Sequence, residues 1–145
     1  MNISVQGFRT SSADWEAVKN LSDDQVPPLS PEQREVARKM GIPERDYARS
    51  VLAGQRTMER MVLKTERFAR YLHERFKEMA PQASVDSVAL NTWDGRFEVS
   101  VAVGDRSIPI RIAEELVDDY FDSGSPEMGQ RLDHVLSLAI HAQVA

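Results

Sequence analysis

Three histidines are the first side chains to test for metal or acid–base chemistry. His73 lies between Leu72 and Glu74, whereas His134 and His141 stand seven residues apart. Two zinc ligands on one helix usually stand three or four residues apart, and seven residues rise about 10.5 Å along the axis. The chain has no cysteine, which removes thiolate chemistry and Cys-based zinc sites. The spacing therefore favours structural or solvent-exposed histidines over a shared metal.

Five carboxylates crowd one short segment, the acidic patch: Glu114, Glu115, Asp118, Asp119 and Asp122. Paired carboxylates act as general acid and base when one of them is desolvated. The spacing lacks the alternating ligands, central glycine and terminal glutamate of a calcium loop. Three interpretations stay open: a solvated helix face, a contact for a basic partner, and a catalytic or metal site.

Glycine-rich catalytic motifs are absent from the chain. It contains no G-x-S-x-G nucleophile turn, no G-x-x-x-x-G-K-[ST] phosphate loop and no G-x-G-x-x-G turn. These chemistries need backbone N–H groups exposed on glycine turns. The sequence therefore predicts no catalytic, cofactor or metal residues, and a protein that is not an enzyme.

Basic residues align along one long segment at the spacing of a helix face. At about 100° per residue they fall within roughly 60° of a common line. This arginine line comprises Arg45, Arg49, Arg56, Arg60, Lys64, Arg67 and Arg70, and all but Arg45 are predicted partner-binding residues. A solvated face, an acidic protein surface such as the acidic patch of another copy, a nucleic-acid backbone and a membrane surface are the candidate contacts. Few aromatic residues interrupt the line, which disfavours specific single-strand binding.

The segment that carries these residues, Pro43 to Pro81, is predicted to be one helix of about 37 residues, roughly 55 Å long. Apolar residues follow one another on its opposite side in steps of three and four, as in helices that pack along their length. They form the predicted oligomer seam: Met58, Val62, Thr65, Ala69, Leu72 and Phe76. A helix longer than a small domain predicts a homodimer through this seam.

Elements on either side follow from caps and periodicity. Ser30, Pro31 and Gln33 start a short helix that ends at Gly41, with Val36 and Met40 on its inner face. Alternating apolar residues predict strands, starting with 85–91, followed by 97–103 and 107–112. Pro109 requires that the last strand be an edge there or point the proline nitrogen outward. Helices follow over 113–121 and from Ser125 onward. The predicted fold class is α+β: a long amphipathic helix plus a three-stranded antiparallel β-meander followed by two helices.

Domain organisation follows from the same pattern. Residues 1–29 are predicted to be a flexible arm, in which 2–8 could form a short strand and 13–21 one or two helical turns. Residues 30–81 form a helical hairpin and residues 82–145 a βββαα unit, with 30–145 as one compact domain. Paired prolines at Pro27 and Pro28 mark the end of the arm.

One stretch resembles a known family. Leu29-Ser30-Pro31-Glu32, then Gly41-Ile42-Pro43 and Tyr47, is similar to a helical hairpin of phage head-morphogenesis proteins, notably the scaffold-like part of Mu-like head proteases. Pro43 stands where that pattern has a capping serine. The resemblance covers 29–48 and implies a phage or prophage origin and an assembly role, with no catalytic residues to carry over.

Charge and composition narrow the function classes. The net charge is −5, yet 44–79 holds nine basic and six acidic residues, against nine and seventeen elsewhere. No apolar run approaches the ~20 residues of a membrane span, and no signal-peptide core is present, which predicts a cytoplasmic protein without a membrane partner. We expect a non-enzymatic interaction or assembly module that binds itself and another protein. A nucleic-acid-binding regulator and a small inhibitor or adaptor of a host protein are the alternatives.

Overall fold

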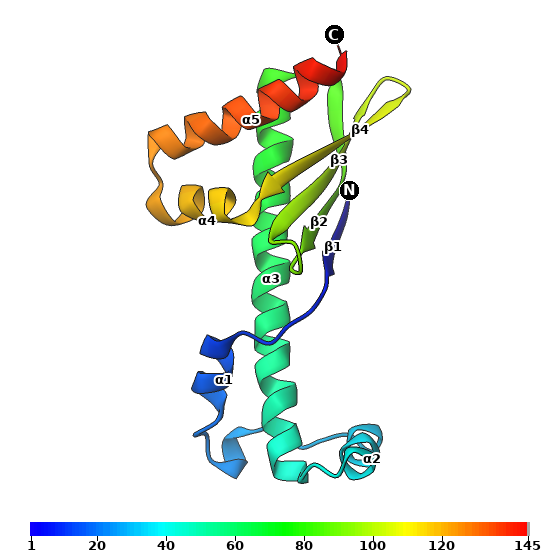
Figure 1. The fold of residues 1–145 in the computed structure, drawn as a ribbon, viewed down its shortest axis with the longest axis vertical. Coiled ribbons are helices and arrows are strands. Elements are labelled where there is room, and N and C mark those ends of the chain that lie inside the picture. Colours follow the sequence, from blue (N-terminus) through cyan, green and yellow to red (C-terminus); the bar gives the residue numbers. More distant parts are fainter. Residues whose placement is uncertain (145) are drawn as a thin grey trace. The chain divides into compact units, whose positions relative to one another are not determined.

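The computed structural model describes residues 1–144, with side chains through His141, and confirms an α+β fold. Figure 1 shows its elements in chain order. They are β1 (Asn2–Gln6), α1 (Ser12–Val18), the 3-10 turn η1 (Asp23–Gln25), α2 (Pro31–Met40), α3 (Glu44–Met79), β2 (Ala83–Asn91), β3 (Arg96–Val103), β4 (Arg106–Ala113), α4 (Glu114–Ser123) and α5 (Pro126–Val144).

The chain divides into two compact units whose boundary lies inside α3. Residues 1–8 and those from Met61 onward form one, the sheet unit, and residues 9–60 form the other, the helical unit. This division differs from the predicted boundaries after residues 29 and 81. A helix without an interior breaker gives no compositional sign of where its contacts change, so the sequence offers nothing at residue 60.

The sheet unit contains one four-stranded sheet in the order β1-β2-β3-β4. β2, β3 and β4 form the predicted antiparallel meander, but β1 adds parallel to β2, with Asn2 opposite Ser87 and Gln6 opposite Asn91. The prediction of a three-stranded sheet is therefore wrong by one strand. A parallel partner is reached through a long connection and leaves no turn signal in the sequence. Pro109 lies on the outer strand β4, as expected for a residue that cannot donate to a ladder.

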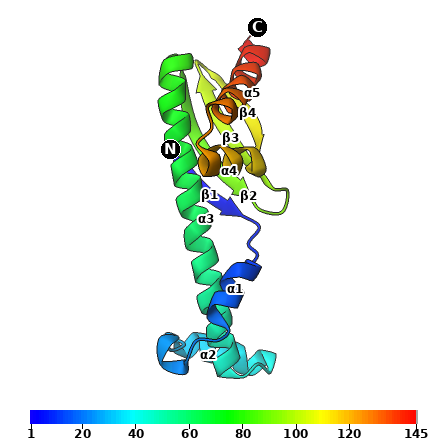
Figure 2. The same cartoon turned by 90° about the vertical axis from the view of Figure 1, so that its left-hand side faces the viewer.

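One face of the sheet is buried under helices. Alternate residues of the strands, such as Val88, Phe97 and Ile110, join Phe68 and Leu132 in a single apolar core. Figure 2 shows α4 and α5 crossing in front of the sheet. The Phe68 and Phe97 ring centroids lie 4.6 Å apart. Burying each such side chain stabilises the fold by about 1.5–3 kcal/mol, so the second half of α3 is an integral layer of the sheet unit.

The helical unit confirms the predicted caps of α2. The Ser30 hydroxyl accepts from the Gln33 N–H, and the Gln33 side chain accepts from the Ser30 N–H. Gly41 ends the helix with φ of 70°, a conformation that favours glycine. The prediction that Val36 and Met40 face inward is wrong, because they are 42% and 61% exposed. α2 instead buries only Ala37, whose small side chain permits close contact at a single turn.

Residues 1–29 contain the short strand and the helical turns that the sequence suggested within the predicted arm. β1 is hydrogen-bonded into the sheet, and Ser11 caps α1 by accepting from the Asp14 N–H at 3.1 Å. Val18, Val26 and Leu29 are buried. These apolar residues are too sparse to show a periodicity, although each one contributes to packing in the helical unit.

Candidate interaction surface

Most of the arginine line is satisfied within its own chain. In the helical unit, Arg49 is 5% exposed and donates to the Leu21 carbonyl and, at 2.9 Å, to Asp23. That hydrogen bond, followed by the charges of Arg45 and Arg49, lowers the pKa of Asp23. Arg60 donates to both carboxylate oxygens of Asp14. Arg49 and Arg60 therefore form ion pairs within the helical unit, and their predicted contact with a partner stays a prediction.

The sheet unit uses the next residues of the line in the same way. The Lys64 ammonium lies 2.9 Å from Glu114 and 3.0 Å from Asp118. Burial alone lowers the pKa of Lys64, but hydrogen bonds and charge from the two carboxylates outweigh it and raise that pKa. The Arg67 guanidinium lies 4.2 Å from the centre of the Phe121 ring. The acidic patch thus meets the arginine line within one chain, whereas the sequence suggested another copy.

Two predicted partner-binding residues stay available. Arg56 and Arg70 are exposed, and neither forms an ion pair with another residue that the structure describes. In the acidic patch, Glu115, Asp119 and Asp122 are also exposed. Contacts within the chain therefore engage part of the arginine line, although Arg45 and Arg60 keep 69% and 54% of their side chains exposed.

The predicted oligomer seam is largely an internal face of α3. Thr65, Ala69, Leu72 and Phe76 are at most 2% exposed, and they lie in the sheet unit. Met58 and Val62 are half-buried. A heptad pattern predicts an apolar face on a helix but does not show which element packs against that face. Here the sheet packs against the face from Thr65 to Phe76. This part of the seam cannot receive a second helix while the sheet unit is folded.

A different surface is open beside β1. A groove of about 500 Å³ lies between this strand and α3, lined by Met1, Ile3, Glu66, Ala69, Arg70 and His73. Met1 and Ile3 are 56% and 39% exposed. We refer to it as the β1 groove. It includes Ala69 of the predicted seam and Arg70 of the arginine line, so the long helix does contribute to an open surface, through neighbouring residues.

Some backbone hydrogen-bonding groups of β1 have no partner in a neighbouring strand of the described sheet. The Gln6 carbonyl accepts from the Thr92 N–H at 2.9 Å, so Gln6 faces β2. Successive residues of a strand direct their N–H and C=O groups to opposite edges. Ile3 and Val5 therefore direct theirs away from β2, at the outer edge of the sheet shown in Figure 1.

The two edge strands of the sheet differ in whether their residues prevent the addition of another strand. β4 carries Arg106, Pro109 and Arg111, and charges and proline are common means of preventing strand addition. β1 has the sequence Asn-Ile-Ser-Val-Gln, with no charge and no proline. The lack of charge and proline points to an interaction element only once β1 is known to lie at an edge. Sequence reasoning missed it because nothing local shows that this segment lies at an edge.

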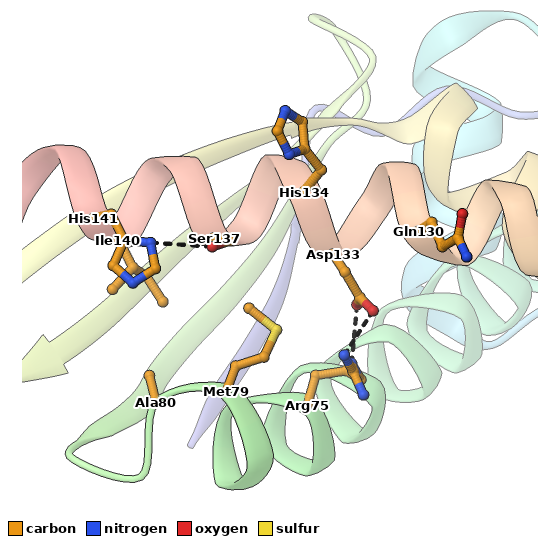
Figure 3. Close-up of a pocket in the computed structure, with 9 residues that line it drawn as sticks. All are labelled: Arg75, Met79, Ala80, Gln130, Asp133, His134, Ser137, Ile140 and His141. Carbon is orange, nitrogen blue, oxygen red and sulfur yellow. Dashed lines mark hydrogen bonds and ion pairs between the residues drawn. The ribbon is translucent and has the colours of Figure 1, made fainter.

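A second hollow lies between the end of α3 and α5, with a volume of about 410 Å³. Figure 3 shows Arg75 reaching Asp133 across it. Asp133 accepts from Arg75 Nε at 2.9 Å, from Arg75 Nη2 at 2.6 Å and from the Tyr71 hydroxyl at 2.8 Å. Burial, reinforced by Asp133, raises the pKa of Tyr71. These three side chains hydrogen-bond to one another, so their role in the cleft is to connect α3 with α5.

The two histidines of α5 do not converge in this cleft. His141 Nδ1 lies 3.1 Å from the Ser137 hydroxyl, while His134 points away from Arg75 and Met79 (Figure 3). No cluster of three or more His, Asp or Glu side chains suited to a metal ion occurs within the described residues. The Ser137–His141 contact joins neighbours one turn apart on α5, and among the described side chains no third group orients it, as a nucleophile–base pair requires.

Comparisons with known proteins identify no relative. No family model matches the chain, and no significant match was found among curated proteins or solved structures. Among the described helices, none combines the length and apolar character needed to cross a membrane. The described surfaces of the chain include the β1 groove, which lies between the edge strand β1 and α3.

Proposed function

We propose that this chain is a non-enzymatic protein-interaction module that binds a strand of its partner at the outer edge of β1. One observation carries the proposal: an edge strand without charge or proline lies beside an apolar groove of about 500 Å³. A strand added there gains main-chain hydrogen bonds from the edge and side-chain contacts from the groove. Each hydrogen bond contributes about 0.5–1.5 kcal/mol net, so the apolar contacts of Met1 and Ile3 are needed as well.

The charge distribution favours a protein partner over nucleic acid. Non-specific nucleic-acid binding depends on several cations that neutralise phosphates. Arg49, Arg60 and Lys64 are already paired with carboxylates of the same chain. The β1 groove itself holds one acid and one arginine, Glu66 and Arg70, a balance that suits a polypeptide better than a polyanion.

Ile3→Lys tests this function, because it places a charge in the groove through a side chain that is already partly exposed. Leu138→Lys is the matched control, on α5 and 55% exposed. Each protein is purified alone and is also added to a soluble extract of cells that carry the gene. The masses of its assemblies are then measured by light scattering after size exclusion.

The expected result is an assembly in at least one setting for the wild type and for Leu138→Lys, and at least a tenfold weaker one for Ile3→Lys. Thermal melting confirms that Ile3→Lys is folded. If the wild type is monomeric in both settings, or if Ile3→Lys assembles equally well, the proposed function is wrong.

A further inference from the structure

We infer that the strand bound at β1 is β1 of a second copy, so that two sheets join into one continuous eight-stranded sheet. This inference rests on the proposed function and names its partner. A two-fold related pair of strands must run antiparallel, and the contact must be self-complementary, since the same patch is used twice. Three properties of the β1 groove meet that requirement.

The first property is backbone register. Ile3 and Val5 present the outward N–H and C=O groups of β1, and hydrogen-bonded pairs in an antiparallel ladder form between such outward residues. Only one two-fold register uses both of them on both strands: Ile3 opposite Val5 of the second copy. It gives four main-chain hydrogen bonds and places the axis at Ser4. Registers centred on Ile3 or Val5 leave the other residue opposite the end of the strand.

The second property is charge. Glu66 and Arg70 both line the groove and stand four residues apart on α3, so they lie on one face of the helix, one turn from each other. A two-fold axis reverses their order in the second copy, which sets each acid toward the other copy's arginine. Neither side chain has an ion pair among the described residues of its own chain. A partner that carried only acidic or only basic residues at this position could pair with just one of Glu66 and Arg70.

The third property is the apolar lining. Ile3 pairs with Val88 in the sheet, whose side chain is fully buried, so Ile3 lies on the core-facing side of β1. It is nevertheless 39% exposed, because none of the residues that the structure describes covers it at the edge. In the proposed register its cross-strand neighbour is Val5 of the second copy, a β-branched pair that stabilises adjacent strands by roughly 0.2–1 kcal/mol.

A single-cysteine experiment tests the register, and the chain suits it because it contains no cysteine. Ser4 would face Ser4 of the second copy as a non-hydrogen-bonded pair, with Cα atoms about 4.5 Å apart. This separation is within the range of roughly 4.4–6.8 Å that a disulfide spans. Ser107→Cys is the matched control, an exposed serine on β4 at the opposite edge. Both variants are oxidised mildly at tens of micromolar, and the wild-type mass is measured in parallel.

We expect the purified wild type to have twice the chain mass of 16.4 kDa. Ser4→Cys should form a covalent dimer at least tenfold faster than Ser107→Cys, and adding Ile3→Lys should abolish that advantage. A monomer when pure that assembles only in extract overturns self-pairing but leaves the proposed function intact. A dimer that survives Ile3→Lys, or in which both cysteines cross-link at equal rates, also overturns the inference.

Discussion

Arg60 and Asp14 form a two-point ion pair within the helical unit. Arg60 Nη1 donates to Asp14 Oδ1 at 2.9 Å, and Nη2 donates to Oδ2 at 2.6 Å. The Thr57 hydroxyl donates to the same carboxylate and also accepts from the Ser11 N–H at 3.1 Å. One buried carboxylate thereby links the cap of α1 to two successive turns of α3.

This relationship predicts that Arg60→Ala destabilises the helical unit. The variant leaves the buried Asp14 carboxylate without its cationic partner, and an unpaired buried charge is costly. Arg56→Ala, one turn away and exposed, should change the free energy of unfolding by no more than about 0.5 kcal/mol. Protease susceptibility of 9–60, measured alongside thermal melting, separates the two variants. If the two variants have the same protease susceptibility and melting temperature, the Arg60–Asp14 ion pair does not stabilise the helical unit.

The same carboxylate predicts a loss of stability in acid. The hydrogen bond from Arg60, followed by those from Thr57 and Ser11, holds the pKa of Asp14 far below its ordinary value of 3.8. Below pH 3.8 the Asp14 carboxylate is protonated in the unfolded chain but stays ionised in the folded chain. Its contribution to the free energy of unfolding is therefore complete above about pH 4 and falls as the pH drops further. Urea unfolding at pH 5 and pH 3 measures it. Asp14→Asn and Arg60→Ala should both flatten this dependence, and an unaltered slope in both would contradict the assignment.

Leu72 distinguishes a core residue from a seam residue. It is fully buried in the core of the sheet unit, so Leu72→Ala should lower the free energy of unfolding by about 2–5 kcal/mol. Leu138→Ala, which alters an exposed leucine, should stay within about 0.5 kcal/mol. Unfolding is measured in urea over a tenfold range of protein concentration. A loss that appears only at high concentration would instead place Leu72 at a subunit interface.

Gly7 is required by both its conformation and its neighbour. Its φ is +71°, and a Cβ at this position would lie 1.8 Å from Trp93 Cδ1. Gly7→Ala should cost roughly 1–2 kcal/mol from backbone strain and force the indole out of its position. Gly41 has a similar φ of +70° but open space around it. Gly41→Ala should therefore lower the free energy of unfolding through backbone strain alone. Indole emission in a Trp15→Phe background should shift for Gly7→Ala and stay constant for Gly41→Ala.

Local signals predicted much of the fold because they act within a few residues. The capping box at Ser30, the glycine at Gly41 and the uninterrupted helix gave α2 and α3 nearly to the residue. The strand alternation and the turns at Gly95 and Gly104, with φ of 64° and 60°, gave the meander. Each of these features is fixed by the conformational preference of the residue that carries it.

The candidate surface could not be predicted in the same way because it depends on distant contacts. Gln6 and Thr92 are 86 residues apart, and Arg60 and Asp14 are 46 apart. A sequence shows that Arg60 is a cation, but not that the fold supplies a carboxylate to meet it. Likewise the apolar stripe of α3 fits a partner helix or a sheet equally well, and only Phe97 and its neighbours decide between them.

The arginines and proline of β4 also set a limit on growth. If one edge of a sheet accepts a strand and the opposite edge refuses it, addition ends after a single step and both accepting edges are consumed. A sheet open on both sides could continue into a fibril. If the chain pairs through β1 as proposed, Pro109, Arg106 and Arg111 on β4 would disfavour a second addition at the opposite edge, so the assembly would end at a pair of chains.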